Sequence, residues 1–303
     1  MPAPRLLPVD GAGPEDVAIH PDGTVYTGVE DGRILALPAD GGAPRRVAET
    51  GGRPLGVEIA ADGALLVCDA YRGLLRVDPR SGRVEALIPA GDALTVCNNA
   101  AIATDGTVYF SDSTRRFPLA YWRADLLEHS GTGRLLRRTP DGAVDVLLDG
   151  LHFANGVALA ADESYVVVAE TGAYRLSRLW LTGSRAGQRD TLVDNLPGFP
   201  DNLSTGSDGR IWIAIGSPRN RLLDWAHART PLIRRTVWAL PERLQPGPER
   251  TAWAMAVDGT GRVVADLQGT GDRYHFVTGV REHGGLLYLG SLVERTIAVV
   301  DLL

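Results

Sequence analysis

The stretch that decides the fold is residues 100–112, AAIATDGTVYFSD, in which two β-rich runs flank an Asp-Gly pair. Such a pair between alternating apolar runs is a strong hairpin signal, because glycine adopts the positive φ that a primed turn needs. Related stretches recur as VAIHPDGTVYTG (17–28), VEIAADGALLVCD (57–69), VALAADESYVVVAE (157–170), LSTGSDGRIWIAI (203–215) and, more weakly, WAMAVDGTGRVVAD (253–266). The chain therefore contains an internal repeat built on a hairpin.

The repeat has the period of a propeller blade. The turn aspartates of its six copies are separated by 40, 43, 57, 46 and 50 residues. A third β-rich run follows most copies, such as GRILALP at 32–38 and GLLRVDP at 73–79. Six units of four short strands predict an all-β fold, a six-bladed β-propeller with four-stranded antiparallel blades. We expect residues 1–303 to form this single domain.

The longest interval contains an insertion, residues 115–133, with the sequence RRFPLAYWRADLLEHSGTG. Its central part, YWRADLLEH, is expected to form one or two helical turns. Insertions at a propeller face often carry binding residues, so we interpret this one as a lid or pocket wall.

The amino-acid composition excludes several classes of function. All 31 basic residues are arginine, which excludes Schiff-base chemistry and every other role that needs a lysine amine. The net charge is -6 and the arginines are scattered, so nucleic acid is not expected as a partner. No apolar run reaches the roughly 18 residues of a membrane span, and the amino terminus is polar, so we predict a cytoplasmic protein without a membrane partner. Cys68 and Cys97 are expected to be buried free thiols.

One equivalent position in the repeats is occupied mostly by side chains that could bind a metal ion. Seven residues before the turn aspartates stand Glu15, Leu55, Asn98, Asn155, Asp201 and Thr251. Four of these six are oxygen donors, and innermost strands of a propeller converge on its axis. Buried carboxylates and amides are costly without partners, whereas calcium binds six to eight such oxygens. We therefore predict a central site for Ca²⁺ or another divalent ion. The alternative is that these are ordinary turn residues, since Asn and Asp are common where strands begin.

The chain resembles a known family in the segments GPEDVAIHPDG (13–23), CNNAAIATDGTVYFSDS (97–113), GLHFANGVALAADESYVVVAET (150–171), LPGFPDNLS (196–204) and VTGVREHGGLLYLGSL (277–292). These are similar to the strictosidine synthase-like branch of the calcium-dependent six-bladed propellers, which also include gluconolactonase/senescence marker proteins and paraoxonases. The resemblance implies metal ligands at Glu15, Asn98, Asn155 and Asp201, with Asn202 as an additional ligand.

Two departures from that superfamily limit the chemistry. Thr278 stands where strictosidine synthases have a catalytic glutamate, which disfavours Pictet–Spengler condensation. Leu55 stands where paraoxonases have a catalytic histidine. The resemblance then implies a gluconolactonase-like mechanism, a calcium-dependent hydrolysis of lactones or related esters in which Asp201 acts as base or nucleophile. Its partner is a small-molecule substrate.

Further candidates come from residues near these motifs. His275 and His152 are candidate catalytic residues, although each could instead make a structural hydrogen bond. The expected substrate pocket contains Tyr121, Trp122, His129, Phe153 and Phe199, with Tyr274 nearby; ordinary packing is the alternative. Two other functions stay open. One is a different metal-dependent enzyme, such as a cyclase, an epoxide-opening enzyme or a phosphotriesterase; the other is a non-enzymatic propeller that binds a small molecule.

Overall fold

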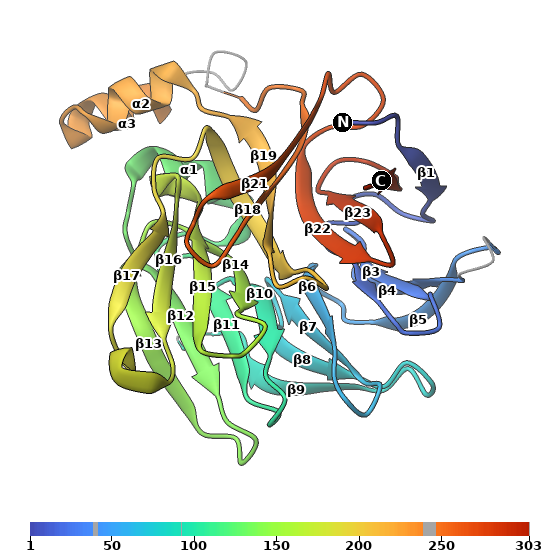
Figure 1. Cartoon of the computed structure of the whole chain (residues 1–303). Coiled ribbons are helices and arrows are strands. Elements are labelled where there is room, and N and C mark those ends of the chain that lie inside the picture. The colour runs from blue at the N-terminus through green and yellow to red at the C-terminus, as the bar shows by residue number, and fades with distance from the viewer. Residues whose placement is uncertain (39–41, 92, 239–246, 303) are drawn as a thin grey trace.

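The computed structural model describes residues 1–38, 42–91, 93–238 and 247–302 (Figure 1). Six four-stranded antiparallel sheets are arranged around a common axis. This confirms the all-β six-bladed propeller with four-stranded blades.

The first three blades follow the chain in order. Blade 1 contains β2 (Ala18–Ile19), β3 (Val25–Gly28), β4 (Arg33–Leu37) and β5 (Arg45–Glu49). Blade 2 contains β6 (Pro54–Ile59), β7 (Leu65–Asp69), β8 (Gly73–Val77) and β9 (Val84–Pro89). Blade 3 contains β10 (Cys97–Ile102), β11 (Val108–Asp112), β12 (Gly133–Arg138) and β13 (Val144–Leu151).

The last three blades complete the ring. Blade 4 contains β14 (Ala154–Leu159), β15 (Tyr165–Glu170), β16 (Arg175–Trp180) and β17 (Arg189–Val193). Blade 5 contains β18 (Gly198–Thr205), β19 (Ile211–Pro218), β20 (Ala252–Val257) and β21 (Val263–Gly269). Blade 6 contains β22 (Val277–His283), β23 (Leu286–Ser291), β24 (Thr296–Asp301) and the amino-terminal strand β1 (Arg5–Pro8).

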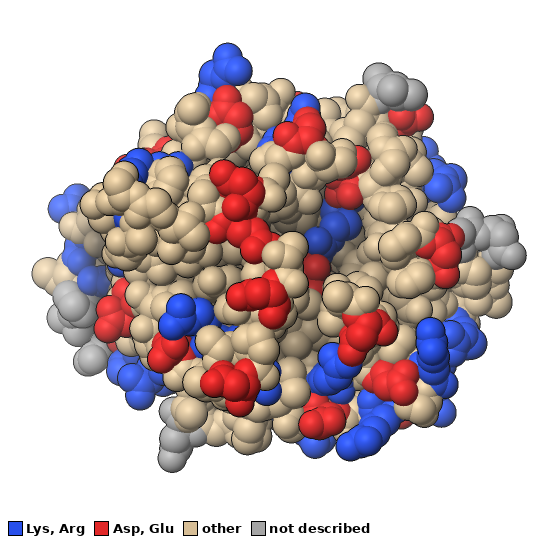
Figure 2. Space-filling view, turned by 60° about the horizontal axis from the view of Figure 1, so that its bottom comes forward, with Lys and Arg blue, Asp and Glu red and all other residues tan. Residues whose placement is uncertain are grey.

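Blade 6 closes the ring by joining the two ends of the chain. Strand β1 pairs antiparallel with β24, with Arg5 opposite Val299 and Pro8 opposite Thr296. Apolar faces of neighbouring blades pack against each other, as where Val157 and Leu159 of blade 4 meet Tyr109 and Leu135 of blade 3. The outer surface carries mixed charge: Figure 2 shows acidic and basic side chains interspersed around a central hollow on one face.

Three short helices gather beside one another at one end of the propeller (Figure 1). Helix α1 (Trp122–Glu128), preceded by the 3₁₀ turn η1 (Leu119–Tyr121), lies in the insertion at 115–133 and confirms the expected helical turns. Helices α2 (Arg221–His227) and α3 (Pro231–Trp238) lie between β19 and β20. The repeat pattern did not predict α2 and α3. Two further 3₁₀ turns are η2 (Thr171–Ala173) and η3 (Gly183–Arg185).

The hairpin turns differ in detail from the prediction. At 20–24 the ladder closes with His20 N donating to Thr24 O, and Gly23 N donating to His20 O. Gly23 has φ 87°, whereas Asp22 has no positive φ, so the loop is a three-residue turn ending in a left-handed glycine rather than a primed two-residue turn. Asp22 Oδ1 accepts from Thr24 N at 2.8 Å, which explains why aspartate recurs at this position.

The sequence pattern predicts the wrong hairpin for the sixth repeat. Asp258 lies in the turn between β20 and β21, the outer pair of blade 5, and not in an innermost hairpin. The inner hairpin of blade 6 is β22–β23, whose turn contains Gly284 and Gly285. The residue at the shared register position is therefore Thr278, not Thr251, because the aspartate that marks the other five turns is absent here.

A β-bulge recurs where the inner strands begin. The ladder register shifts between Pro54 and Val57, Cys97 and Ala100, Ala154 and Val157, Pro200 and Leu203, and Val277 and Gly279. Such bulges interrupt the inside–outside alternation and re-aim side chains. Two consecutive residues per strand thereby become available at the centre of the ring.

The second of those two positions alternates between polar residues and glycine around the ring: Asp16, Gly56, Asn99, Gly156, Asn202 and Gly279. The glycines are required by close approach. A Cβ on Gly156 would lie 2.2 Å from Leu203 N, and one on Gly279 would lie 2.3 Å from Glu15 O. Each glycine thus lets the backbone of the next blade come close.

We expect Gly156→Ala to destabilise the propeller, because the added methyl collides with backbone that cannot move away. Overpacking of this kind costs about 1–3 kcal/mol. Gly247→Ala is the control, since a Cβ there meets no atom of the described residues within 4 Å. Urea unfolding followed by circular dichroism measures both. Equal midpoints for the two variants would contradict this account of the glycine.

Candidate functional site

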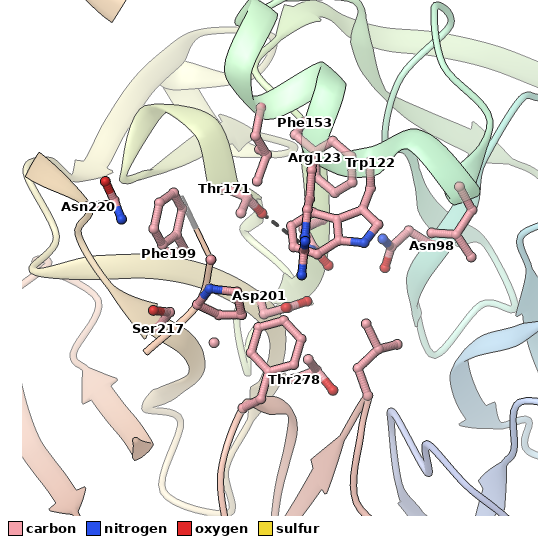
Figure 3. Close-up of a pocket in the computed structure, with 18 of the residues that line it drawn as sticks. Asn98, Trp122, Arg123, Phe153, Thr171, Phe199, Asp201, Ser217, Asn220 and Thr278 are labelled. Atoms are coloured by element: carbon pink, nitrogen blue, oxygen red, sulfur yellow. Dashed lines mark hydrogen bonds between the residues drawn. The ribbon is translucent and has the colours of Figure 1, made fainter. Parts of the chain in front are cut away.

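The four oxygen donors picked out by the register meet in one pocket at the centre of the ring. Glu15 precedes β2, Asn98 lies in β10, Asn155 in β14 and Asp201 in β18, and all four line the same cavity. Figure 3 shows Asn98, Asp201 and Thr278 around its floor. The structure thus brings together four side chains from four different blades.

Each of the four has a buried oxygen with no hydrogen-bond partner among the described residues. These atoms are Glu15 Oε2, Asn98 Oδ1, Asn155 Oδ1 and Asp201 Oδ1. Buried polar atoms are nearly always satisfied, and leaving one unpaired costs roughly 1–3 kcal/mol. Four such oxygens in one pocket therefore fit a cation with oxygen ligands.

The amide nitrogens of the two asparagines are held away from this centre. Asn98 Nδ2 donates to Ser113 Oγ at 2.9 Å, and Asn155 Nδ2 donates to Thr171 Oγ1 at 3.2 Å. The amide oxygens are left as the unpaired atoms. A hard divalent ion prefers carboxylate and amide oxygens, so this donor set fits calcium better than zinc.

The electrostatics of the site also fit a cation. Burial raises the pKa of Glu15 well above its usual value, and the charges of Asp201 and Asp16 add to the effect while Arg53 opposes it. Burial likewise raises the pKa of Asp201 to about 7, and the charge of Asp16 acts in the same direction. Two carboxyl groups in one low-dielectric site repel each other when both are charged. A bound divalent ion removes that repulsion.

The residues one position further along form a second polar layer. Asp16 Oδ2 accepts from Val57 N at 3.1 Å and from Asn99 Nδ2 at 3.2 Å, while Asn99 Oδ1 accepts from Val157 N at 2.8 Å. These bonds link blades 1 to 4. Asn202, the additional ligand implied by the resemblance, belongs to this layer and does not line the pocket. Its Oδ1 is also buried and has no hydrogen-bond partner in the described part of the chain.

Apolar side chains form the walls of the pocket. Trp122, Phe153 and Phe199 are among the residues that line it (Figure 3). The sequence did not point to Leu126 and Leu127 of α1, Leu223 of α2, Trp238 of α3, Phe276 and Leu292, which also line it. The insertion therefore contributes a pocket wall. The wall residues on α2 and α3 could not be found from the repeat, because the segment that contains these helices does not follow its pattern.

Several expected site residues lie elsewhere. Tyr121 is 55% exposed and does not line the pocket, because it lies before the first turn of α1 and projects to solvent. Tyr274 is buried and donates to Leu289 O. His275 does not line the pocket either; its Nδ1 is 2.5 Å from Glu294 Oε1. The geometry places neither aromatic ring nor the imidazole at the polar floor.

The other two histidine candidates form a cluster behind the α1 wall. His129, which ends α1 with φ 59°, has its ring 3.8 Å from that of His152 and 4.4 Å from that of His227 on α2. His227 Nε2 lies 2.7 Å from Leu126 O. Burial, aided by the neighbouring His152, lowers the pKa of His129 to about 3. The cluster joins α1, α2 and the loop before β14, and it lies outside the residues that line the pocket.

The comparisons with known proteins agree with this architecture. The strictosidine synthase family model matches residues 94–184, and the strictosidine synthase-like amino-terminal model matches residues 3–37. An adipocyte plasma membrane-associated protein of Salmo salar is 34% identical over 99% of this chain and 78% of its own length. Strictosidine synthase-like protein 6 of Arabidopsis thaliana is 33% identical over 96% of this chain and 79% of its own length.

Solved structures with the same fold have much lower sequence identity. A gluconolactonase of Xanthomonas campestris superposes with a TM-score of 0.71 at 18% identity, covering 99% of this chain and 90% of its own. A calcium-binding regucalcin of Agrobacterium tumefaciens has a TM-score of 0.68 at 15% identity, covering 98% of this chain and 93% of its own. These likenesses support the fold.

The prediction of a cytoplasmic location is wrong. Relatives from salmon, rat and human that are 33–34% identical over at least 95% of the chain are named adipocyte plasma membrane-associated proteins, which points to a membrane. The prediction rested on the lack of a long apolar run and on the polar amino terminus. Within the described ranges, no helix is long and apolar enough to cross a bilayer.

We expect the histidine cluster to make stability sensitive to acid. The folded-state pKa of His129 is about 3 and that of an unfolded histidine is about 6.5, so below pH ~6.5 the unfolded chain binds a proton that the folded chain does not. Stability is therefore lost as the pH falls from about 6.5 toward 3. His129→Asn removes this proton while tolerating the left-handed backbone.

Urea unfolding between pH 7.5 and 4.5 at constant calcium tests the effect. The free energy of unfolding should fall less steeply with acid in His129→Asn than in the wild type. The exposed His283→Asn is the control and should keep the wild-type slope. Parallel slopes for His129→Asn and the wild type would show that the cluster does not couple to folding.

Proposed function

Because the chain belongs to the strictosidine synthase-like family of six-bladed propellers, we propose that it is a calcium-dependent hydrolase of lactones or related esters. The observation that carries the proposal is the set of four buried, unpaired oxygens on the floor of an apolar pocket. The family and its structural neighbours include enzymes, namely strictosidine synthase and gluconolactonase.

Glu15, Asn98, Asn155 and Asp201 would hold the ion. The two carboxylates balance its charge and the two amide oxygens complete the protein part of the ligand set. When bound, calcium supplies Lewis acidity that polarises an ester carbonyl and increases the acidity of water. The second layer around Asp16 and Asn99 supports these ligands from behind through its hydrogen bonds between blades.

Asp201 is the proposed base or nucleophile. The residue is partly exposed, while its Oδ1 is buried. One carboxylate can therefore face both the ion and the pocket. Of the described residues that line the pocket, Glu15, Arg123 and Asp201 are the ionisable ones. Glu15 is 4% exposed and suits charge balance, so Asp201 is the carboxylate best placed to accept a proton from attacking water.

The pocket does not contain the catalytic residues on which other reactions of the superfamily depend. Thr278 lines the floor where strictosidine synthases have glutamate, and its Oγ1 donates to Glu15 O at 3.0 Å. Leu55 lines it where paraoxonases have histidine. Neither side chain can act as a general base. Because the chain has no lysine, an amine nucleophile is absent as well.

The walls favour a substrate with a hydrocarbon body. Leucine, phenylalanine and tryptophan side chains surround the polar floor, and Arg123 is the cationic residue among them. A polyhydroxylated sugar lactone needs hydrogen-bond partners along its length, and above the floor these walls offer few beyond Arg123, Ser217 and Asn220. We therefore propose lactones or esters with an alkyl or aryl substituent.

The competing function is a non-enzymatic propeller that binds a small molecule and keeps calcium for rigidity. It is favoured by the relatives named after a location rather than an activity. The two functions differ in what the loss of one carboxylate does, because a purely structural ion affects stability and no rate.

Dialysis against a calcium chelator should abolish hydrolysis of a panel of alkyl lactones and aryl esters, and added Ca²⁺ should restore it. Asp201→Asn should lower kcat by at least about 100-fold, the scale of general-base catalysis, while the protein stays folded. The rate of hydrolysis, measured as product formed, and the thermal unfolding midpoint are determined for the same samples. Activity that survives chelation would refute the metal-dependent mechanism. A rate unaffected by Asp201→Asn, with lowered stability, would favour the structural ion.

Trp122→Ala should weaken binding of long-chain lactones, because the indole is part of the wall. Each methylene that loses its apolar contact costs about 0.8 kcal/mol, so we expect KM for an octyl-substituted lactone to rise roughly tenfold, with a smaller effect on unsubstituted butyrolactone. The exposed neighbour Tyr121→Ala is the control. Equal KM changes for both lactones would contradict the assignment of this wall to the alkyl chain.

A further inference from the structure

Thr171 is the first residue of η2, directly after β15; it lines the pocket beside the proposed metal ligands and is 5% exposed. Its hydroxyl makes two hydrogen bonds. Oγ1 donates to the backbone oxygen of Pro200 at 2.7 Å and accepts from Asn155 Nδ2 at 3.2 Å. The bond to Asn155 is visible beside Thr171 in Figure 3. The residue thus contacts one proposed ligand and the residue that precedes another, Asp201.

The chemistry of these bonds determines which end of the Asn155 amide faces the pocket. A backbone carbonyl can only accept, so the single hydroxyl proton of Thr171 is committed to Pro200 O. What remains toward Asn155 is a lone pair, which can be met only by the NH₂ group. The opposite rotamer would place two acceptors against each other. Asn155 Oδ1 is therefore directed to the centre of the ring, where it is the buried unpaired atom.

Ser113 stands at the same place in blade 3 but does not impose the same constraint. Its Oγ accepts from Asn98 Nδ2 at 2.9 Å. Ser113 and Thr171 each follow a fully buried carboxylate, Asp112 and Glu170, so the two positions correspond. Among the described residues, no carbonyl accepts the proton of Ser113 Oγ. Its hydroxyl can rotate and donate, so it tolerates either orientation of the Asn98 amide.

We propose that Thr171 is the positioning residue that sets the Asn155 amide for cation binding and couples it to the strand that carries Asp201. The inference rests on the proposed metal centre. Loss of the hydroxyl frees the amide to turn its NH₂ toward the ion, which repels it, and removes the hydrogen bond between η2 and β18. Outer partners of metal ligands commonly change metal affinity 10–100-fold.

Calcium binding by titration calorimetry tests this without any measurement of activity. Thr171→Val, which keeps the side-chain shape, should raise the Kd for Ca²⁺ by about 10–100-fold, whereas Thr171→Ser should stay close to the wild type. Ser113→Ala should have a smaller effect than Thr171→Val. Thr50→Val is the control, because Thr50 is a buried threonine outside the pocket whose hydroxyl also donates, to Asp69 Oδ2, and accepts, from Gly52 N.

The same Thr171→Val substitution in an Asn155→Asp variant distinguishes a positioning effect on the amide from a general loss of stability. In Asn155→Asp the side chain presents oxygen on both sides, so orientation no longer matters and Thr171→Val should change the Kd little. A large loss of affinity in both backgrounds, or no loss in either, overturns the proposal. A wild-type protein that does not bind Ca²⁺ would instead overturn the metal centre itself, and so the two failures are distinguishable.

Discussion

The structure depends on the pairing of β1 with β24, which closes the ring of blades. Without this pairing, blade 6 would lack its outermost strand, and the amino-terminal segment that leads into blade 1 would not be attached to the last blade. Closure places residues distant in sequence, such as Glu15 and Thr278, in hydrogen-bond contact. Every feature of the central site follows from that convergence.

The recurrent β-bulges bring polar side chains to the centre of the ring, where they form the candidate site. Because the register shifts at the start of the inner strands, two successive residues per blade reach the centre, and they serve different purposes. The first set contributes oxygens to the pocket floor, and the second set links the blades through Asp16 and Asn99. Glycines at the alternate positions allow the close backbone approach that this arrangement needs.

The polar floor and the apolar walls come from different parts of the chain. The floor belongs to the repeat, whereas α1, α2 and α3 belong to two insertions that pack on each other through Leu127, Leu223, Ala226 and Val237. A propeller can thus keep its central chemistry while the insertions change the substrate. The histidine cluster holds the two insertions together next to the pocket.

The sequence alone determined the blade number, the strands of the hairpins and the four oxygen donors, because each depends on local turn chemistry repeated at a fixed period. It misplaced the sixth register position at Thr251, since the turn of β22–β23 lacks the aspartate that marks the others. Tertiary structure alone decided that Thr278 lies at the floor, that α2 and α3 cover the pocket, and that His152 and His275 are directed elsewhere. These outcomes depend on contacts between segments far apart in the chain, and no local pattern encodes them.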